Sequence, residues 1–205
     1  MTPGAAGTAD STPPPAGVWN IANVLTLARI ALVPVFVWLL FQDGAGLRLA
    51  AFGVFALASI TDKIDGDLAR RRNIVTDFGK IADPIADKAL TGAALVGLSL
   101  LGELWWWVTA VILVREIGIT VLRFVVIRYG VIPASKGGKL KTMLQVIAIG
   151  LFVLPGPLDP LRWATMAAAL AVTVVTGGDY VVQAWRLRHR GRSRADDGTG
   201  AGTGA

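Results

Sequence analysis

The chain has 205 residues, of which 54% are hydrophobic and 17% are charged, and its formal net charge is +6. A water-soluble domain carries about a quarter charged residues, so this composition argues against a soluble enzyme, and the apolar excess excludes a chain that is disordered throughout. The absence of cysteine excludes disulfides, thiolate metal sites and cysteine catalysis, and a single histidine excludes a histidine-based metal site.

One membrane domain is predicted between two tails. Residues 1–18 are rich in Pro, Gly, Ala, Ser and Thr, which favours a disordered N-terminal tail. We expect the membrane domain to occupy residues 19–189, without an internal repeat, and a second disordered tail to occupy residues 190–205.

Six apolar stretches approach the length of a transmembrane helix, which takes about 20 residues. They are expected at residues 21–41, 47–64, 81–101, 104–127, 140–154 and 161–185. The fifth stretch is short and needs residues before Leu140, or a tilt, to cross a bilayer. The predicted fold is therefore all-α, a polytopic integral membrane protein with six transmembrane helices.

Lysine and arginine are distributed unevenly among the loops that join these stretches. Sixteen of them fall within the segments 63–88, 123–141 and 186–194, whereas the loops on the other side hold only Arg48 and Arg162. Because positively charged loops stay in the cytoplasm, both termini are predicted to be cytoplasmic. The basic segments also attract anionic lipid, so a bilayer is a better partner for this chain than nucleic acid.

Acidic residues gather at the cytoplasmic ends of the second and third stretches, where six of the 14 lie between Asp62 and Asp87. Asp62 and Asp65 are three residues apart, and Asp83 and Asp87 are four apart, so each pair shares one face of its helix. A short polar loop joins the two helices. We therefore expect antiparallel neighbours whose acidic faces meet.

Four carboxylates that converge at a membrane boundary repel one another unless cations lie among them. Such oxygen ligands prefer hard divalent ions, Mg²⁺ first and Mn²⁺ as a substitute, and paired ions commonly hold a phosphate that undergoes displacement. Gly66 and Gly79 allow a ligand or a helix to come close, and Ala69 does so more weakly. Arg70 is suited to bind phosphate. In the alternative, the aspartates pair with neighbouring lysines and arginines in a solvated loop.

This arrangement resembles the signature of the CDP-alcohol phosphatidyltransferases. The family pattern Asp-x2-Asp-Gly-x2-Ala-Arg-x8-Gly-x3-Asp-x3-Asp has eight fixed positions over 26 residues, and all eight match from Asp62 to Asp87 without a gap. The resemblance covers all but the two tails. The stretches 20–29, 115–123 and 138–142 look like the branch of the family that forms phosphatidylglycerophosphate.

The resemblance implies a membrane enzyme, usually a homodimer, that transfers a phosphatidyl group from CDP-diacylglycerol to an alcohol and releases CMP. Carried over to this chain, it makes Asp62, Asp65 and Asp83 ligands of two Mg²⁺ ions, with the first and third bridging both ions. Asp87 contacts the second ion and acts as the catalytic base. The active site is expected at the cytoplasmic face of the cell membrane. Its CDP-diacylglycerol pocket is expected to comprise Asn23, Thr26, Gly66, Ala69, Arg70 and Gly79.

Four cations near the cytoplasmic side of the fourth and fifth stretches indicate the acceptor: Arg115, Arg123, Lys139 and Lys141. A charge within an apolar span is costly and faces a cavity or a partner. We predict that these cations bind the phosphate of sn-glycerol 3-phosphate, so that the product is phosphatidylglycerophosphate. In the alternative, Glu116 neutralises Arg115, and the two lysines only anchor their helix at the membrane surface.

Two other functions stay open on the sequence alone. A sibling enzyme of the same family would use another acceptor, such as phosphatidylglycerol in cardiolipin synthesis, inositol phosphate or a neutral alcohol. A small cation channel or transporter would line an ion path with the aspartates. Against the channel, the aspartates cluster at one membrane face, whereas a path across the bilayer needs polar groups along its length.

Overall fold

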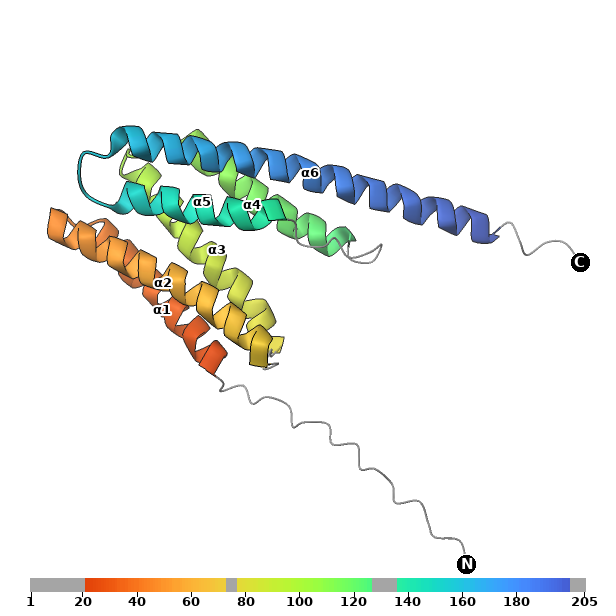
Figure 1. Ribbon diagram of the computed structural model, residues 1–205, viewed down its shortest axis with the longest axis horizontal. Helices are drawn as coiled ribbons and strands as arrows, with labels where there is room; N and C mark the ends of the chain where they lie inside the picture. Colours follow the sequence, from red (N-terminus) through yellow and green to blue (C-terminus); the bar gives the residue numbers. More distant parts are fainter. Residues whose placement is uncertain (1–20, 73–76, 127–135, 200–205) are drawn as a thin grey trace, which may run out of the picture.

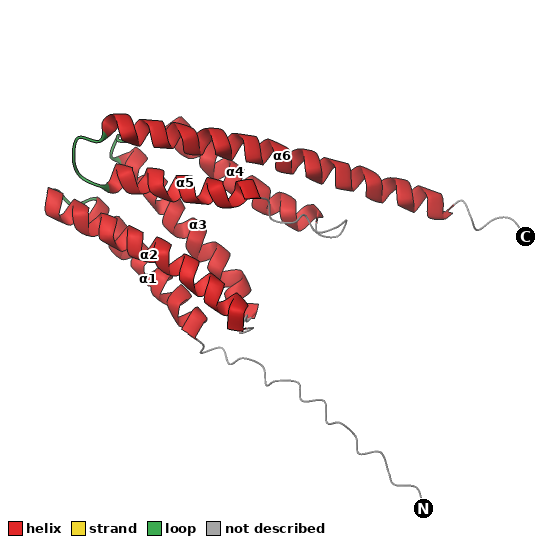
Figure 2. Cartoon of the chain, viewed as in Figure 1, coloured by secondary structure: helices red, strands yellow, loops and turns green. Residues whose placement is uncertain are grey.

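The computed structural model describes residues 21–72, 77–126 and 136–199. All regular secondary structure within these ranges is helical (Figure 2). The helices are α1 (Ile21–Leu40), α2 (Ala45–Arg72), α3 (Asp77–Leu100), α4 (Trp106–Val126), α5 (Lys136–Val153) and α6 (Asp159–Thr199). The predicted all-α class with six helices is thus confirmed for the part of the chain that the structure describes.

Successive helices run in alternating directions, so their connections gather at the two ends of a bundle. The loops α1–α2, α3–α4 and α5–α6 lie together at the left in Figure 1, and the opposite helix ends point to the lower right. The helices α1 and α2 form one pair and α5 and α6 form another, while α3 crosses between the pairs and contacts both. The ends of α2 and α3 that carry the acidic motif therefore lie at the same end of the bundle as the start of α1.

The bundle is apolar both inside and outside. Two helical segments, Ala45–Asp62 and Asp159–Trp185, are long and apolar enough to cross a membrane by themselves, and α1, α3 and α5 contain shorter apolar segments. Large apolar side chains also face outward on every helix, among them Trp38, Leu57, Leu100, Val114, Met143 and Trp185. An apolar exterior of this extent is typical of a surface that contacts lipid.

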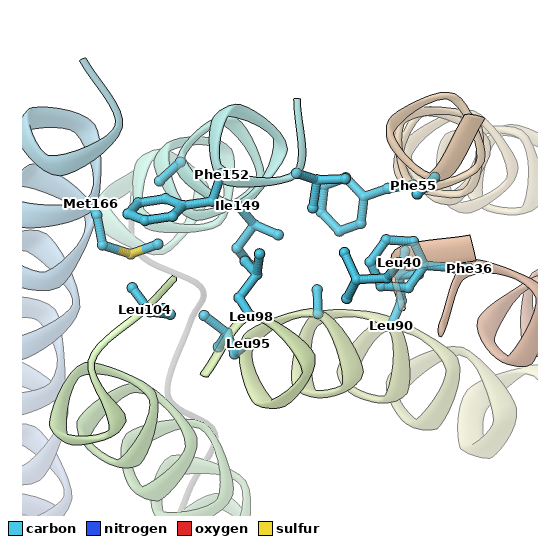
Figure 3. Close-up of a cluster of buried hydrophobic side chains, with 14 of the residues drawn as sticks. Phe36, Leu40, Phe55, Leu90, Leu95, Leu98, Leu104, Ile149, Phe152 and Met166 are labelled. Atoms are coloured by element: carbon cyan, nitrogen blue, oxygen red, sulfur yellow. The ribbon is translucent and has the colours of Figure 1, made fainter. Parts of the chain in front are cut away.

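A single apolar core holds the helices together (Figure 3). Phe36 of α1 and Phe55 of α2 pack with their ring centroids 5.7 Å apart, and Leu98 of α3 lies near Ile149 of α5. At Gly97 of α3 a side chain of α1 packs against the backbone, because an added Cβ would lie 2.6 Å from a methyl group of Leu40. The core therefore fixes α1 and α2 against α3, which carries half of the acidic motif.

A glycine with a left-handed backbone lies in each of the three connections at the loop end of the bundle. Gly44, Gly102 and Gly156 have φ angles of 107°, 72° and 125°, which other residues rarely adopt. Gly102 lies just after the last turn of α3, where a left-handed residue commonly terminates a helix, whereas Gly44 directly precedes α2 and Gly156 lies in the loop before α6. The short connections that result place consecutive helices side by side.

Two arginines fasten this same end. Arg48 Nε donates to the backbone oxygen of Val153 at 3.1 Å, and the guanidinium also pairs with Glu103. Arg162 Nε donates to the backbone oxygen of Leu151 at 2.9 Å. These oxygens belong to the last turn of α5, whose carbonyl groups have no partner within the helix. The two basic residues on the side with few charges therefore have a structural role.

Four of the six described helices, α2, α3, α5 and α6, extend further at one or both ends than the apolar stretches from which they were predicted. The helix α5 begins at Lys136, which supplies the residues that the short fifth stretch needs. The helix α6 continues to Thr199, whereas a tail was expected from residue 190. Once a helix exists, each further residue is added at little cost, and arginine and alanine are good helix formers. The expected N-terminal tail, residues 1–18, lies outside the described residues.

Candidate functional site

The four aspartates of the motif lie on two helices, as expected. Asp62 and Asp65 are in the last turns of α2, and Asp83 and Asp87 are in the first turns of α3. The two helices contact each other and end at the same end of the bundle (Figure 1). Of these four side chains, the structure describes that of Asp62. The meeting of all four carboxylates therefore stays a prediction.

Asp62 is held by an arginine from another helix. Arg29 of α1 donates from Nη1 to Asp62 Oδ1 over 2.5 Å. The arginine side chain is 1% exposed, whereas that of Asp62 is 38% exposed, so the pair reaches from the helix interface to the surface. Sequence reasoning did not include Arg29 among the site residues. The available signal was its charge within an apolar span, the same signal that selected Arg115.

Of the side chains predicted to form the nucleotide pocket, the structure describes only that of Thr26. Thr26 is buried and lies one turn before Arg29, so both residues are on the face of α1 that packs against its neighbours. The other five predicted residues lie on helices, but their side chains are outside the described part: Asn23, Gly66, Ala69, Arg70 and Gly79. Their convergence on one ligand stays a prediction.

The chemistry of the donor set fits a hard divalent cation. All four predicted ligands are carboxylates, which Mg²⁺ and Mn²⁺ accept, and no sulfur or imidazole lies in the motif. Among the side chains that the structure describes, no group of three or more potential metal ligands occurs. Three of the four aspartates fall outside that set, so the metal site stays a prediction.

A second polar cluster connects α4, α5 and α6. Arg115 Nη1 donates to Glu116 Oε1 at 3.2 Å, and Nη2 donates to Thr176 Oγ1 at 3.0 Å. Lys141 Nζ donates to the same oxygen of Glu116. Two of the four predicted acceptor cations, Arg115 and Lys141, therefore meet at one carboxylate. The cluster of these three ionised groups keeps one net positive charge.

Glycine makes room for Arg115 on α6. A Cβ at Gly177 would lie 3.2 Å from Arg115 Cγ, so the arginine passes directly over this residue. The other two predicted acceptor cations, Arg123 on α4 and Lys139 on α5, have side chains outside the described part. That these two cations join the cluster stays a prediction.

A cavity of about 150 Å³ opens beside Glu116, between α3, α4 and α5. Lys88 lines it from α3 and also donates to Thr120 Oγ1. Gln145 lines it from α5 and is only 4% exposed, yet its buried Oε1 accepts no hydrogen bond from the described part of the chain. Sequence reasoning did not select Lys88 or Gln145, although each is a polar residue within a largely apolar helix.

Comparison with known proteins places these features in a family. The family model of the CDP-alcohol phosphatidyltransferases matches residues 19–175. The chain is 57% identical over 176 residues to a probable phosphatidylglycerophosphate synthase of Mycobacterium tuberculosis, covering 83% of this chain and 84% of the relative. It is 39% identical to the CDP-diacylglycerol–glycerol-3-phosphate 3-phosphatidyltransferase of Bacillus subtilis, covering 82% of this chain and 96% of the relative. An enzyme of the same name from Rickettsia typhi is 36% identical to the chain, covering 78% of this chain and 94% of the relative.

Proposed function

The chain belongs to the CDP-alcohol phosphatidyltransferase family, and on that premise we propose that it transfers the phosphatidyl group of CDP-diacylglycerol to sn-glycerol 3-phosphate. The products are phosphatidylglycerophosphate and CMP, and the protein is a transferase of phospholipid synthesis. The observation that carries the proposal is the similarity, over more than four fifths of the chain, to relatives whose names state this enzyme. Those relatives give no support to a cation channel or to a sibling enzyme with another acceptor.

All six helices are proposed to cross the membrane, with both termini and the acidic end of the bundle in the cytoplasm. The strong excess of lysine and arginine at this end supports that orientation. The alternating helix directions in Figure 1 support it as well, because they bring all the basic segments to one side. The membrane domain spans residues 19–189, and the enzyme forms a homodimer in the cell membrane.

The acidic end is proposed to be the reaction centre, with Asp62, Asp65 and Asp83 holding two Mg²⁺ ions. Bound there, the ions would stabilise the negative charge that develops on CMP as it leaves. Asp87, which would also help to hold the second ion, acts as the base that takes the proton of the acceptor hydroxyl. A carboxylate is a weak base, so this proton moves mainly as the new phosphorus–oxygen bond forms.

The CDP group is proposed to lie between α1 and the motif. Thr26 supports this position, because it is buried on α1 next to the arginine that contacts the motif. Asn23 precedes it by one turn, and Arg70 supplies a planar donor for the diphosphate. Gly66, Ala69 and Gly79 allow the close approach of this ligand. The acyl chains of the lipid remain in the bilayer.

The acceptor is proposed to enter the cavity between α3, α4 and α5. Lys88, which lines the cavity, directly follows Asp87 in α3, so the cavity reaches the turn of α3 that carries the proposed base. Lys141 lines the same cavity and contacts Glu116 together with Arg115, so two cations lie where a phosphate would be bound. Arg123 and Lys139 complete the proposed phosphate site from the ends of α4 and α5 nearest the cytoplasm.

An acceptor panel tests this function. Purified protein is incubated with CDP-diacylglycerol, Mg²⁺ and one acceptor at a time: sn-glycerol 3-phosphate, inositol phosphate, phosphatidylglycerol or glycerol. The release of CMP is measured, with an Asp87→Asn variant as the blank. We expect turnover with sn-glycerol 3-phosphate to exceed the others by at least tenfold, on the order of one lost charge-assisted contact. Faster turnover with glycerol or inositol phosphate would refute the assignment of the acceptor.

A further inference from the structure

We propose that Arg29 is a positioning residue for the metal-binding carboxylates, which acts by fixing Asp62 from the neighbouring helix. The inference rests on the proposed function, because it takes Asp62 to be a ligand of Mg²⁺. It adds a residue outside the signature, on a helix that contributes none of the four proposed metal ligands.

The burial of Arg29 requires a reason beyond stability. Arg29 is the single charged residue of α1, and its side chain is 1% exposed. Taking the charge of Arg29 out of water costs free energy that its attraction to a partly exposed carboxylate returns only in part, and apolar residues of the same volume often stabilise a protein at least equally well. A pair of this kind is therefore poorly explained by stability alone, and a second role for Arg29 follows.

The geometry of the pair points to orientation of the carboxylate. Arg29 reaches Asp62 across 33 positions of sequence and contacts one defined oxygen, Oδ1. A guanidinium is planar and does not lose its proton, so it offers the carboxylate a fixed positive donor and holds it in one orientation. The carboxylate is still 38% exposed, so it remains accessible from the acidic end of the bundle.

The charge of Arg29 serves the motif in a second way. Four aspartates at one end of two helices repel one another, and this repulsion opposes their assembly before any cation binds. A fixed positive charge at Asp62 offsets part of the repulsion. The aspartates are then already arranged when the metal ions arrive, and less binding energy is lost in ordering them.

A simpler role, in which Arg29 merely links α1 to α2, has a matched control within the chain. Arg48 also joins helices through a carboxylate, that of Glu103, and through backbone oxygens of α5. It lies at the opposite end of the bundle from the motif (Figure 1). The variant Arg48→Gln therefore removes a link of the same kind without affecting the proposed site.

The test compares the full-length wild type with Arg29→Gln, Arg29→Lys and Arg48→Gln in detergent. Binding of Mn²⁺ is measured from the electron paramagnetic resonance signal of the free ion, and unfolding temperatures are measured in EDTA. Loss of a residue that orients a metal ligand typically weakens binding about 10- to 100-fold, which is the effect expected for Arg29→Gln. Arg29→Lys keeps the charge without the planar fork, so we expect an intermediate affinity. Arg48→Gln should bind Mn²⁺ like the wild type.

Two results would overturn the inference: wild-type affinity for Mn²⁺ in Arg29→Gln, or an equal loss of affinity in Arg48→Gln. If Arg29→Gln yields no folded protein, Arg29→Lys decides the question, since wild-type affinity in that variant also overturns it. A wild type that binds no Mn²⁺ would instead refute the proposed metal site, which separates the two failures.

Discussion

Replacing Lys141 with methionine removes one of the two cations that contact Glu116 and keeps a side chain of similar length. Lys141 is 5% exposed, so water screens its charge little, and it faces the cavity proposed for the acceptor. A charge-assisted hydrogen bond contributes about 1.5–3 kcal/mol, and 1.4 kcal/mol corresponds to a factor of ten in affinity. We therefore expect the KM for sn-glycerol 3-phosphate to rise about 10- to 100-fold.

The same substitution distinguishes the phosphate site from a purely structural cluster. Glu116 keeps its contact with Arg115 at 3.2 Å, so the loss of Lys141 does not leave this carboxylate without a partner. We expect the KM for CDP-diacylglycerol to stay within about twofold, because a contact confined to the acceptor does not affect the other substrate. Steady-state release of CMP, with each substrate varied in turn, measures both constants. An unchanged KM for the acceptor in a folded Lys141→Met protein would refute the reasoning, and Arg162→Gln at the far end of the bundle serves as the control.

Three further substitutions test the rest of the proposed site. Asp62→Asn should lower turnover at least 100-fold and abolish most Mn²⁺ binding, while the yield of membrane-inserted protein stays the same. Full activity of the wild type in excess EDTA would contradict the metal assignment. Asp87→Asn should abolish transfer and still bind CDP-diacylglycerol in an equilibrium assay, so near-normal turnover would exclude it as the base. Gln145→Leu should raise the unfolding temperature, because a buried oxygen without a donor costs about 1–3 kcal/mol. The same variant should raise the KM for sn-glycerol 3-phosphate if an acceptor hydroxyl donates to Gln145, and an unchanged KM removes it from the site.

The helices and the motif were predictable because both depend on local patterns. Apolar stretches and the spacing of Asp62, Asp65, Asp83 and Asp87 are visible in the sequence itself. Hydropathy underestimates the helices at their polar ends, however, since the backbone continues to hydrogen-bond after the side chains leave the apolar region. This explains why α2 extends to Arg72 beyond its apolar stretch.

The contacts between helices were only partly predictable. Glu116 was expected as a possible partner of its neighbour Arg115, and the structure confirms the contact. The link from Lys141 to Glu116 spans 25 positions, and the link from Arg29 to Asp62 spans 33. Such pairs depend on which helices pack together and at what height, and a single sequence does not contain that information. A charge within an apolar span indicates that a partner exists without identifying it.

The length of α6 has a practical consequence for imaging so small a membrane protein. Its 41 residues amount to about 60 Å of helix, twice the roughly 30 Å of a hydrocarbon core. The segment after Trp185 therefore continues for about 20 Å past the apolar part, and in Figure 1 α6 extends beyond the ends of the other five helices. A soluble helical protein fused in register at Thr199 would continue this helix without a hinge. It would give electron cryomicroscopy a rigid marker for alignment outside the detergent micelle.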